Sequence, residues 1–187
     1  MKTGKNYESL YRRNQKTGRV IIDINLGDYL EFFHEWDNAA FRKRDIHPEL
    51  VQFLDLCSEE IPLRNKLEIV FTIGTNKSPE KEEMIRTSYR NYYNSVKRLE
   101  TRKTKRIIKI SAILLSIALT LLTAYGLLVD FRESNIISKV LLESLLIGGW
   151  VFTWEAVHML FLDIIEPFRR RREIKRFLEA ELTFKYL

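Results

Sequence analysis

The sequence predicts an α+β fold in which a two-helix transmembrane hairpin is inserted into a small cytoplasmic domain. Two apolar runs, 107–129 and 136–162, are each longer than the roughly 20 helical residues needed to cross a bilayer core. Basic clusters flank the pair of runs on both sides. Outside the pair, three short segments alternate apolar and polar residues, which is typical of strands.

The flanking charges predict how the hairpin is oriented. Only residues 130–135 separate the runs, so we expect a short turn there. The positive-inside rule places both basic clusters and both termini in the cytoplasm, with the turn outside. We therefore predict a multi-pass protein of the cell (inner) membrane. The residues expected to contact anionic lipid headgroups are Arg102, Lys103, Lys105, Arg106, Arg169, Arg170, Arg171 and Arg172.

The charge balance also indicates the kinds of partner. The chain of 187 residues carries a net charge of +6, all of it beyond residue 96. The basic excess therefore belongs to the flanks of the apolar runs and not to residues 1–96, and we expect no binding to nucleic acid. Expected partners are anionic membrane lipids and either a second copy or another membrane protein. Cys57 is the only cysteine, so no internal disulfide can form, as suits a cytoplasmic domain.

The predicted soluble domain combines residues 1–106 with residues 166–187. Its strands lie near 18–25, 67–73 and 181–186. Two strands rarely form a stable sheet alone, so we expect the third strand from the tail that the hairpin returns to the cytoplasm. Residues 1–17 show no periodicity and predict a loose arm.

Helical segments complete the predicted domain. Pro48 begins a helix that ends near Glu60, and a short helix is expected within 28–36, with Trp36 in the core. A long helix is predicted to run from about residue 79 into the membrane, because neither Gly nor Pro interrupts the chain until Gly126. The apolar seam expected on its cytoplasmic part comprises Ile85, Tyr89, Tyr92, Val96 and Leu99.

Small side chains form a row on the first predicted membrane helix. Ala112, Ser116, Thr120 and Ala124 recur every four residues. On the second helix Gly148 follows Ser144 at the same spacing, with Gly149 beside it. Such rows let helix backbones approach closely in lipid. The favoured interpretation is that they close the hairpin, and the alternative is that they drive oligomerisation.

Glu155 and His158 form the candidate intramembrane polar site. A carboxylate at membrane depth costs about 2.5–3.5 kcal/mol, so Glu155 should be neutral, paired or in a polar cavity. Ser111, Ser116 and Lys109 lie at a matching depth to serve it. The favoured role is a structural bond across the hairpin, and the alternative is an ion path. Glu-x-x-His is also half of a di-iron motif, but the first helix offers no carboxylate, so no metal is expected.

The remaining sequence offers no catalytic pattern. Ionisable residues cluster between His34 and His47, but without the spacing of a zinc protease, and Asp45 is better explained as a helix cap. The GTNKS segment that begins at Gly74 lacks the spacing of a phosphate-binding loop. We therefore predict a protein that is not an enzyme and has no cofactor.

Four segments carry a resemblance to a known group. AFRKRDIHPELVQFLDLCSEEIP followed by LEIVFTI, then GWVFTWEAVHMLFLDIIEPFRRRREIKRF and a terminal strand, resemble small bacterial membrane proteins of unknown function. The resemblance covers most of the chain from about residue 20. Trp154 and Asp163 match that group, whereas Ala156 stands in place of its Pro and His158 in place of its Glu. The group implies the architecture and brings no activity.

Two classes of function follow from these observations. The first is an interaction, regulatory or scaffold protein that presents a small cytoplasmic domain at the inner leaflet. The alternative is an oligomeric hairpin that conducts or senses ions or protons through Glu155 and His158.

Overall fold

The computed structural model describes residues 10–34, 45–131 and 136–187. The chain divides into two compact units, one made of Met1–Arg98 with Arg171–Leu187 and the other of Leu99–Arg170. Helix α3 (Pro79–Leu128) contributes residues to both units. The predicted long helix that begins near residue 79 is therefore confirmed.

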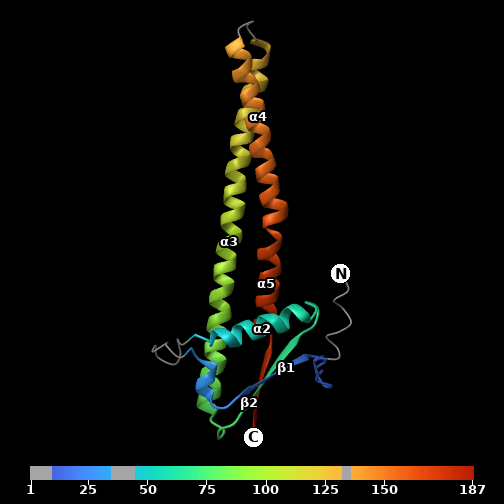
Figure 1. The fold of residues 1–187 in the computed structure, drawn as a ribbon, viewed down its shortest axis with the longest axis vertical. Coiled ribbons are helices and arrows are strands. Elements are labelled where there is room, and N and C mark those ends of the chain that lie inside the picture. Colours follow the sequence, from blue (N-terminus) through green and yellow to red (C-terminus); the bar gives the residue numbers. More distant parts are fainter. Residues whose placement is uncertain (1–9, 35–44, 132–135) are drawn as a thin grey trace. The chain divides into compact units, whose positions relative to one another are not determined.

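A three-stranded parallel sheet forms the centre of the first unit (Figure 1). Its strands are β1 (Val20–Leu26), β2 (Leu67–Ile73) and β3 (Glu181–Tyr186), in that order across the sheet. Both pairings are parallel and each runs the full length of a strand. The predicted sheet, including the strand from the C-terminal tail, is confirmed.

The core of this unit lies on one face of the sheet. Alternate residues of the three strands point there, and the register aligns Ile22 with Ile69 and Leu182. Helices α2 (Pro48–Glu60), the start of α3 and α5 (Ile165–Leu178) cover this face. Their buried side chains are Leu54 and Cys57 of α2, Ile85, Tyr89 and Tyr93 of α3, and Ile174 and Phe177 of α5.

Contacts between aromatic side chains join α3 to α5. The rings of Tyr93 and Phe177 stack with their centroids 4.8 Å apart. The Tyr89 hydroxyl donates a hydrogen bond to the Phe177 carbonyl oxygen over 3.1 Å. Burial raises the pKa of Tyr89 well above its ordinary value, so this hydroxyl remains a donor throughout the physiological range.

The predicted seam on α3 is correct at its start and wrong at its end. Ile85 and Tyr89 are fully buried, but the next buried ring is Tyr93, and Tyr92 only borders the core. Leu99 is 54 % exposed. In a straight α-helix, positions that repeat every seven residues rotate gradually around the helix axis. The buried residues therefore follow steps of four, from Ile85 through Tyr89 to Tyr93, and Leu99 does not face the core.

The other face of β2 is buried as well, although alternation of apolar and polar residues would predict a solvent-exposed face there. Glu68 is only 6 % exposed and accepts hydrogen bonds from Asn14 Nδ2 at 2.7 Å and from Thr183 Oγ1 at 3.0 Å. These two donors stabilise a carboxylate that burial would otherwise disfavour. The residues before β1 are therefore not wholly a loose arm. The Ile21 amide donates to the Arg12 carbonyl oxygen, and Gly18, with φ of 67°, makes the turn between them.

One short helix follows β1 in the described part of the chain before α2. Tyr29–Phe32 forms a 3-10 helix, η1, with Asp28 as its N-cap. The α2 helix spans the predicted residues, but its cap is His47, whose Nδ1 accepts from the Glu49 amide at 3.3 Å, rather than Asp45. His47 is the residue directly before Pro48, so its side chain reaches the first free amide of the helix. The predicted position of Trp36 lies outside the described residues.

Arg176 joins α5 to the C-terminal end of α2. Its guanidinium donates to the carbonyl oxygens of Ser58, Ile61 and Pro62 at 2.7, 2.9 and 3.1 Å, and to the Ser58 hydroxyl. The last carbonyls of a helix lack intrahelical donors, and this side chain supplies them. Burial lowers the pKa of Arg176, while the nearby Glu173 acts in the opposite direction. The sequence shows Arg176 only as one member of a basic run.

Candidate functional site

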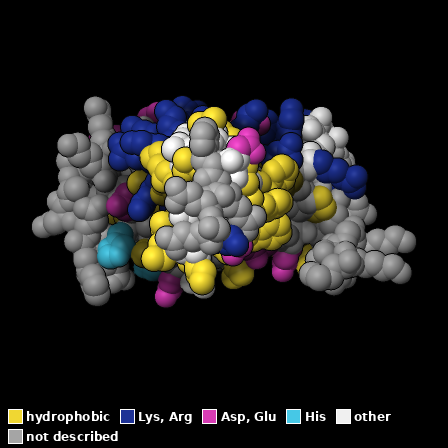
Figure 2. Space-filling view, turned by 90° about the horizontal axis from the view of Figure 1, so that it is seen from above, with side chains coloured by type: hydrophobic (Ala, Val, Ile, Leu, Met, Phe, Trp, Pro, Cys, Tyr) yellow, Lys and Arg dark blue, Asp and Glu magenta, His cyan; other side chains and the backbone are white. Residues whose placement is uncertain are grey.

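The second unit has an apolar surface that is open to its surroundings. Among the described residues, two helical stretches, Pro79–Leu128 and Ile136–Leu178, are long and apolar enough to cross a membrane. Only 11 % and 6 % of their most apolar segments are buried. The core helix of a soluble protein would be mostly buried instead. Figure 2 shows hydrophobic side chains, in yellow, among the exposed atoms of the face that it presents.

Helices α3 and α4 (Ile136–His158) contact each other within this unit through small residues. A Cβ placed on Gly149 would lie 2.6 Å from Leu122 Cγ and 3.5 Å from the Ala118 carbonyl oxygen. Ala118 and Ser111 are fully buried on α3, and Ala156 is 1 % exposed on α4. The absence of a side chain at Gly149 therefore permits close approach of the two backbones.

Most of the row of small residues predicted on α3 lies outside this contact. Ala112, Ser116 and Thr120 are exposed. The favoured interpretation is wrong for these three residues, because the α3 side of the contact follows Ser111, Ala118 and Leu122, at spacings of seven and four on a neighbouring line of the helix. On α4 the predicted glycines do lie at the contact, since a Cβ on Gly148 would lie 3.4 Å from Leu121 and one on Gly149 would overlap Leu122. The alternative, association with a helix of another chain, stays a prediction.

Glu155 lies on the outside of α4. It is exposed, and within the described part of the chain no hydrogen bond or ion pair joins it to Ser111, Ser116 or Lys109. The hydroxyls of Ser111 and Ser116 donate to carbonyl oxygens of their own helix, those of Ile107 and Ala112, at 2.9 and 2.8 Å. Lys109 is exposed. The structure therefore does not assemble these residues into one polar site within a single copy.

A π-helical turn, η4 (Met159–Asp163), follows α4 and brings His158 close to Asp163. Their Nδ1 and Oδ1 atoms are 3.8 Å apart, so they form an ion pair when the imidazole is protonated. Pro167 lies in the first turn of α5 and has no amide hydrogen for the preceding turn, which accounts for a break in regular α-helix here. Turns of π-helix occur often at functional sites.

The predicted headgroup residues lie at the ends of the apolar helices. Arg102, Lys103, Lys105 and Arg106 are all exposed on α3. Lys103 Nζ lies 2.7 Å from Glu100 Oε1. On α5, Arg169 and Arg172 are exposed, and Arg170 and Arg171 are half-buried.

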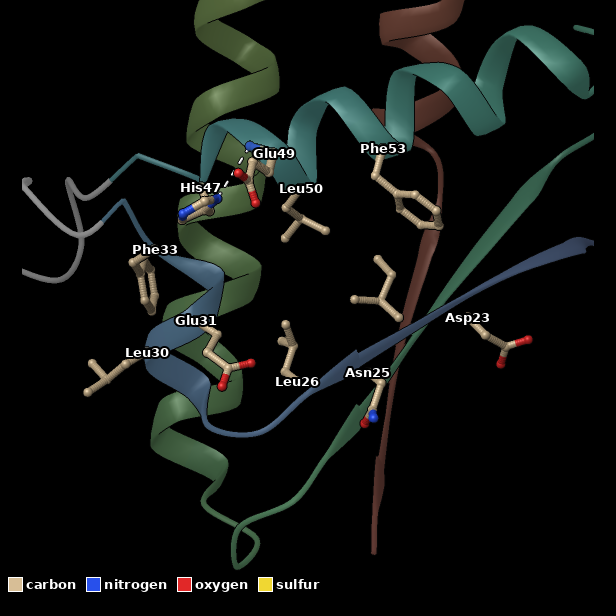
Figure 3. A pocket seen from close by; sticks show the side chains of 11 residues that line it. Asp23, Asn25, Leu26, Leu30, Glu31, Phe33, His47, Glu49, Leu50 and Phe53 are labelled. Carbon is tan, nitrogen blue, oxygen red and sulfur yellow. Dashed lines mark hydrogen bonds between the residues drawn. The ribbon is translucent and has the colours of Figure 1, made fainter.

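The first unit carries a groove of about 620 Å³ between β1 and α2 (Figure 3). Leu50 and Phe53 extend from α2 toward Leu26, while Asp23 and Glu31 lie at the rim. Asp23 is held by Arg12, whose guanidinium is 2.7 Å from its carboxylate. Glu31 accepts a hydrogen bond from the Gly27 amide over 2.8 Å, so Asp23 and Glu31 both have a partner within the unit.

Within the part of the chain that the structure describes, no group of three His, Cys, Asp or Glu side chains is arranged to hold a metal ion. His34 and His47 stack with centroids 6.4 Å apart, but the rest of the ionisable cluster noted in the sequence, 35–44, lies outside the described residues.

No protein-family model, curated protein or solved structure matches this chain. The resemblance to small bacterial membrane proteins therefore stays a prediction, and the functional interpretation rests on the geometry.

Proposed function

We propose that the protein crosses a membrane twice and holds its sheet-containing unit at the cytoplasmic face, where that unit binds itself or another protein. The pairing of β3 with β2 is the observation that carries this proposal. Strand β2 precedes the first apolar helix and β3 follows the second. Segments in one sheet must lie on the same side of a membrane, so the number of crossings between them is even.

The exposed apolar side chains support the crossing itself. Between Ile110 and Val129 the chain carries no charged residue, and most of this stretch is exposed. In water such a surface would be a strong aggregation hazard, whereas in a bilayer it faces hydrocarbon. The basic residues at both ends then orient the pair with the sheet-containing unit in the cytoplasm.

The groove between β1 and α2 supports an interaction role for that unit. It is open and lined by apolar side chains and carboxylates, and Asp23 and Asn25 lie on β1, which is an edge strand. An edge strand beside an apolar groove is a recurring site for binding a protein segment.

Extraction and proteolysis test this proposal. We expect the full chain to resist extraction from vesicles by alkaline carbonate. Protease should remove residues from both ends of the chain in inside-out vesicles and from neither end in right-side-out vesicles. Release by carbonate, or cleavage of one end only in each preparation, would contradict it.

The exposure of Glu155 favours a second candidate function, ion or proton conduction by an oligomer. A carboxylate that faces outward on a membrane helix, with no described partner in its own chain, is stabilised when another copy surrounds it with polar groups. His158, one turn along the same helix, would continue the path toward the cytoplasm.

Replacing Glu155 with Gln is expected to abolish proton flux into liposomes if this second function holds, because the amide cannot release a proton. Glu143→Gln is the matched control, since Glu143 is an exposed acid on the same helix near its outer end. Fluorescence of a trapped pH dye measures the flux, and crosslinking measures assembly. Equal flux in wild type and Glu155→Gln, or no flux in either, removes this candidate.

A further inference from the structure

A second pocket lies wholly within the first unit, where the loop between α2 and β2 faces α5. It has a volume of about 460 Å³. Basic side chains dominate its charged lining, which comprises Arg64, Lys66, Arg172, Lys175 and Arg176 with the single carboxylate of Glu179. The bases come from two separate elements, so the fold, and not one run of sequence, brings them together.

Three of these five basic side chains are not held in an ion pair within the described part of the chain. Glu179 Oε1 lies 3.7 Å from Lys175 Nζ in a solvent-exposed pair. Arg64, Lys66 and Arg172 form no ion pair within the described residues and are exposed. Unpaired like charges that converge on one pocket repel one another, so an anion bound there would relieve the repulsion.

The floor of the pocket adds a buried positive charge. Arg176 is 6 % exposed, and every hydrogen bond that it donates goes to a neutral oxygen. Its Nε has no acceptor in the described structure. Glu173 acts on Arg176 electrostatically but does not line the pocket. Arg19 borders the site, because it donates 3.0 Å hydrogen bonds to the carbonyl oxygens of Leu67 and Glu179.

We propose that this pocket binds a phosphate-bearing ligand. Phosphate oxygens match the planar donor fork of arginine, and Arg64 of the loop and Arg172 of α5 offer two such forks. Lys66 and Lys175 contribute point charges, and Arg176 contributes its field from below. The ligand chemistry has two possible sources, the headgroup of an anionic phospholipid or a soluble phosphate compound. The inference does not depend on membrane crossing, since every lining residue belongs to the first unit.

The test compares two double variants of the full chain. Arg64→Gln with Arg172→Gln removes two charges from the pocket. Lys77→Gln with Lys185→Gln removes two charges from exposed residues of the same unit that do not line it. Binding of inorganic pyrophosphate is measured by calorimetry in neutral detergent. In parallel, hydrogen exchange of 63–67 and 172–179 is compared in nanodiscs of phosphatidylcholine with and without phosphatidylglycerol.

We expect the pocket variant to lose affinity for pyrophosphate by about tenfold or more, since one charge-assisted contact contributes a factor of about ten. The control variant should change affinity by no more than about twofold at the same salt concentration. Protection of both segments by phosphatidylglycerol, lost in the pocket variant, identifies the lipid headgroup as the ligand. Pyrophosphate binding without that protection identifies a soluble phosphate compound. Absence of both effects in wild type, or equal losses in the two variants, overturns the proposal.

Discussion

Replacing Arg176 with methionine will destabilise the sheet-containing unit by about 3–5 kcal/mol. Three buried oxygens lose their donor, namely the carbonyl oxygens of Ser58 and Ile61 and the Ser58 hydroxyl, at a cost of about 1–3 kcal/mol each, partly offset by relaxation, whereas the Pro62 carbonyl keeps the Asn65 amide as a donor. For a unit of this size that loss corresponds to a fall in melting temperature of about 10–20 °C. The stability of the Arg176→Lys protein should lie between that of the wild type and that of Arg176→Met, because one ammonium group can donate to only some of these oxygens. Pulse proteolysis of the full chain in increasing urea measures the effect.

Lys175→Met is the matched control for this prediction. Lys175 directly precedes Arg176 on α5, is exposed and forms only an exposed ion pair. Its replacement should therefore change the free energy of unfolding by less than about 1 kcal/mol. Equal effects of the two substitutions would show that the buried contacts of Arg176 do not join α5 to α2.

Replacing Leu119 with arginine is expected to make the free energy of membrane insertion less favourable by about 2.5–3.5 kcal/mol. This is the cost of a charged residue at the centre of a transmembrane helix. Leu119 is 58 % exposed and lies near the middle of the apolar part of α3. In a water-soluble protein a substitution at such an exposed position would change stability by only about 0.5 kcal/mol. The carbonate-resistant fraction of the protein measures the difference.

Leu56→Arg is the control for Leu119→Arg, because Leu56 is 56 % exposed on α2 in the sheet-containing unit. We expect it to leave the carbonate-resistant fraction unchanged. If both substitutions were tolerated equally, the exposed surface of α3 would not be a lipid-facing surface.

Local patterns in the sequence predict the secondary structure well. The three strands could be predicted because Ile22, Ile69 and Leu182 each belong to a segment in which apolar and polar residues alternate. Helix α2 could be predicted because apolar residues recur at helical spacing after Pro48. Their parallel arrangement does not follow from alternation, which is the same for both strand directions. The roles of Asn14 and Thr183 as donors to Glu68 depend on contacts between distant parts of the chain.

The candidate site was less predictable than the fold. The row of Ala112, Ser116 and Thr120 has the right spacing for helix contact, but small residues also lie on the neighbouring line, and only packing decides between them. Depth along a helix predicts that Ser111 lies level with Glu155 but not that the two side chains face each other. The phosphate pocket combines residues 64 and 66 with residues 172–176, and no local pattern links them.

Labelling of single cysteines tests the double crossing most directly. Cys57 is 4 % exposed and burial raises the pKa of its thiol, so it reacts slowly, and Cys57→Ser removes it altogether. In that background a cysteine is introduced by Lys77→Cys, Asp130→Cys or Lys185→Cys, at positions that are exposed before, between and after the two apolar helices. A membrane-impermeant maleimide applied to intact cells should label only the Asp130→Cys protein, and the other two only after permeabilisation. Labelling of the Lys77→Cys or the Lys185→Cys protein in intact cells would contradict a chain that crosses twice with both ends inside.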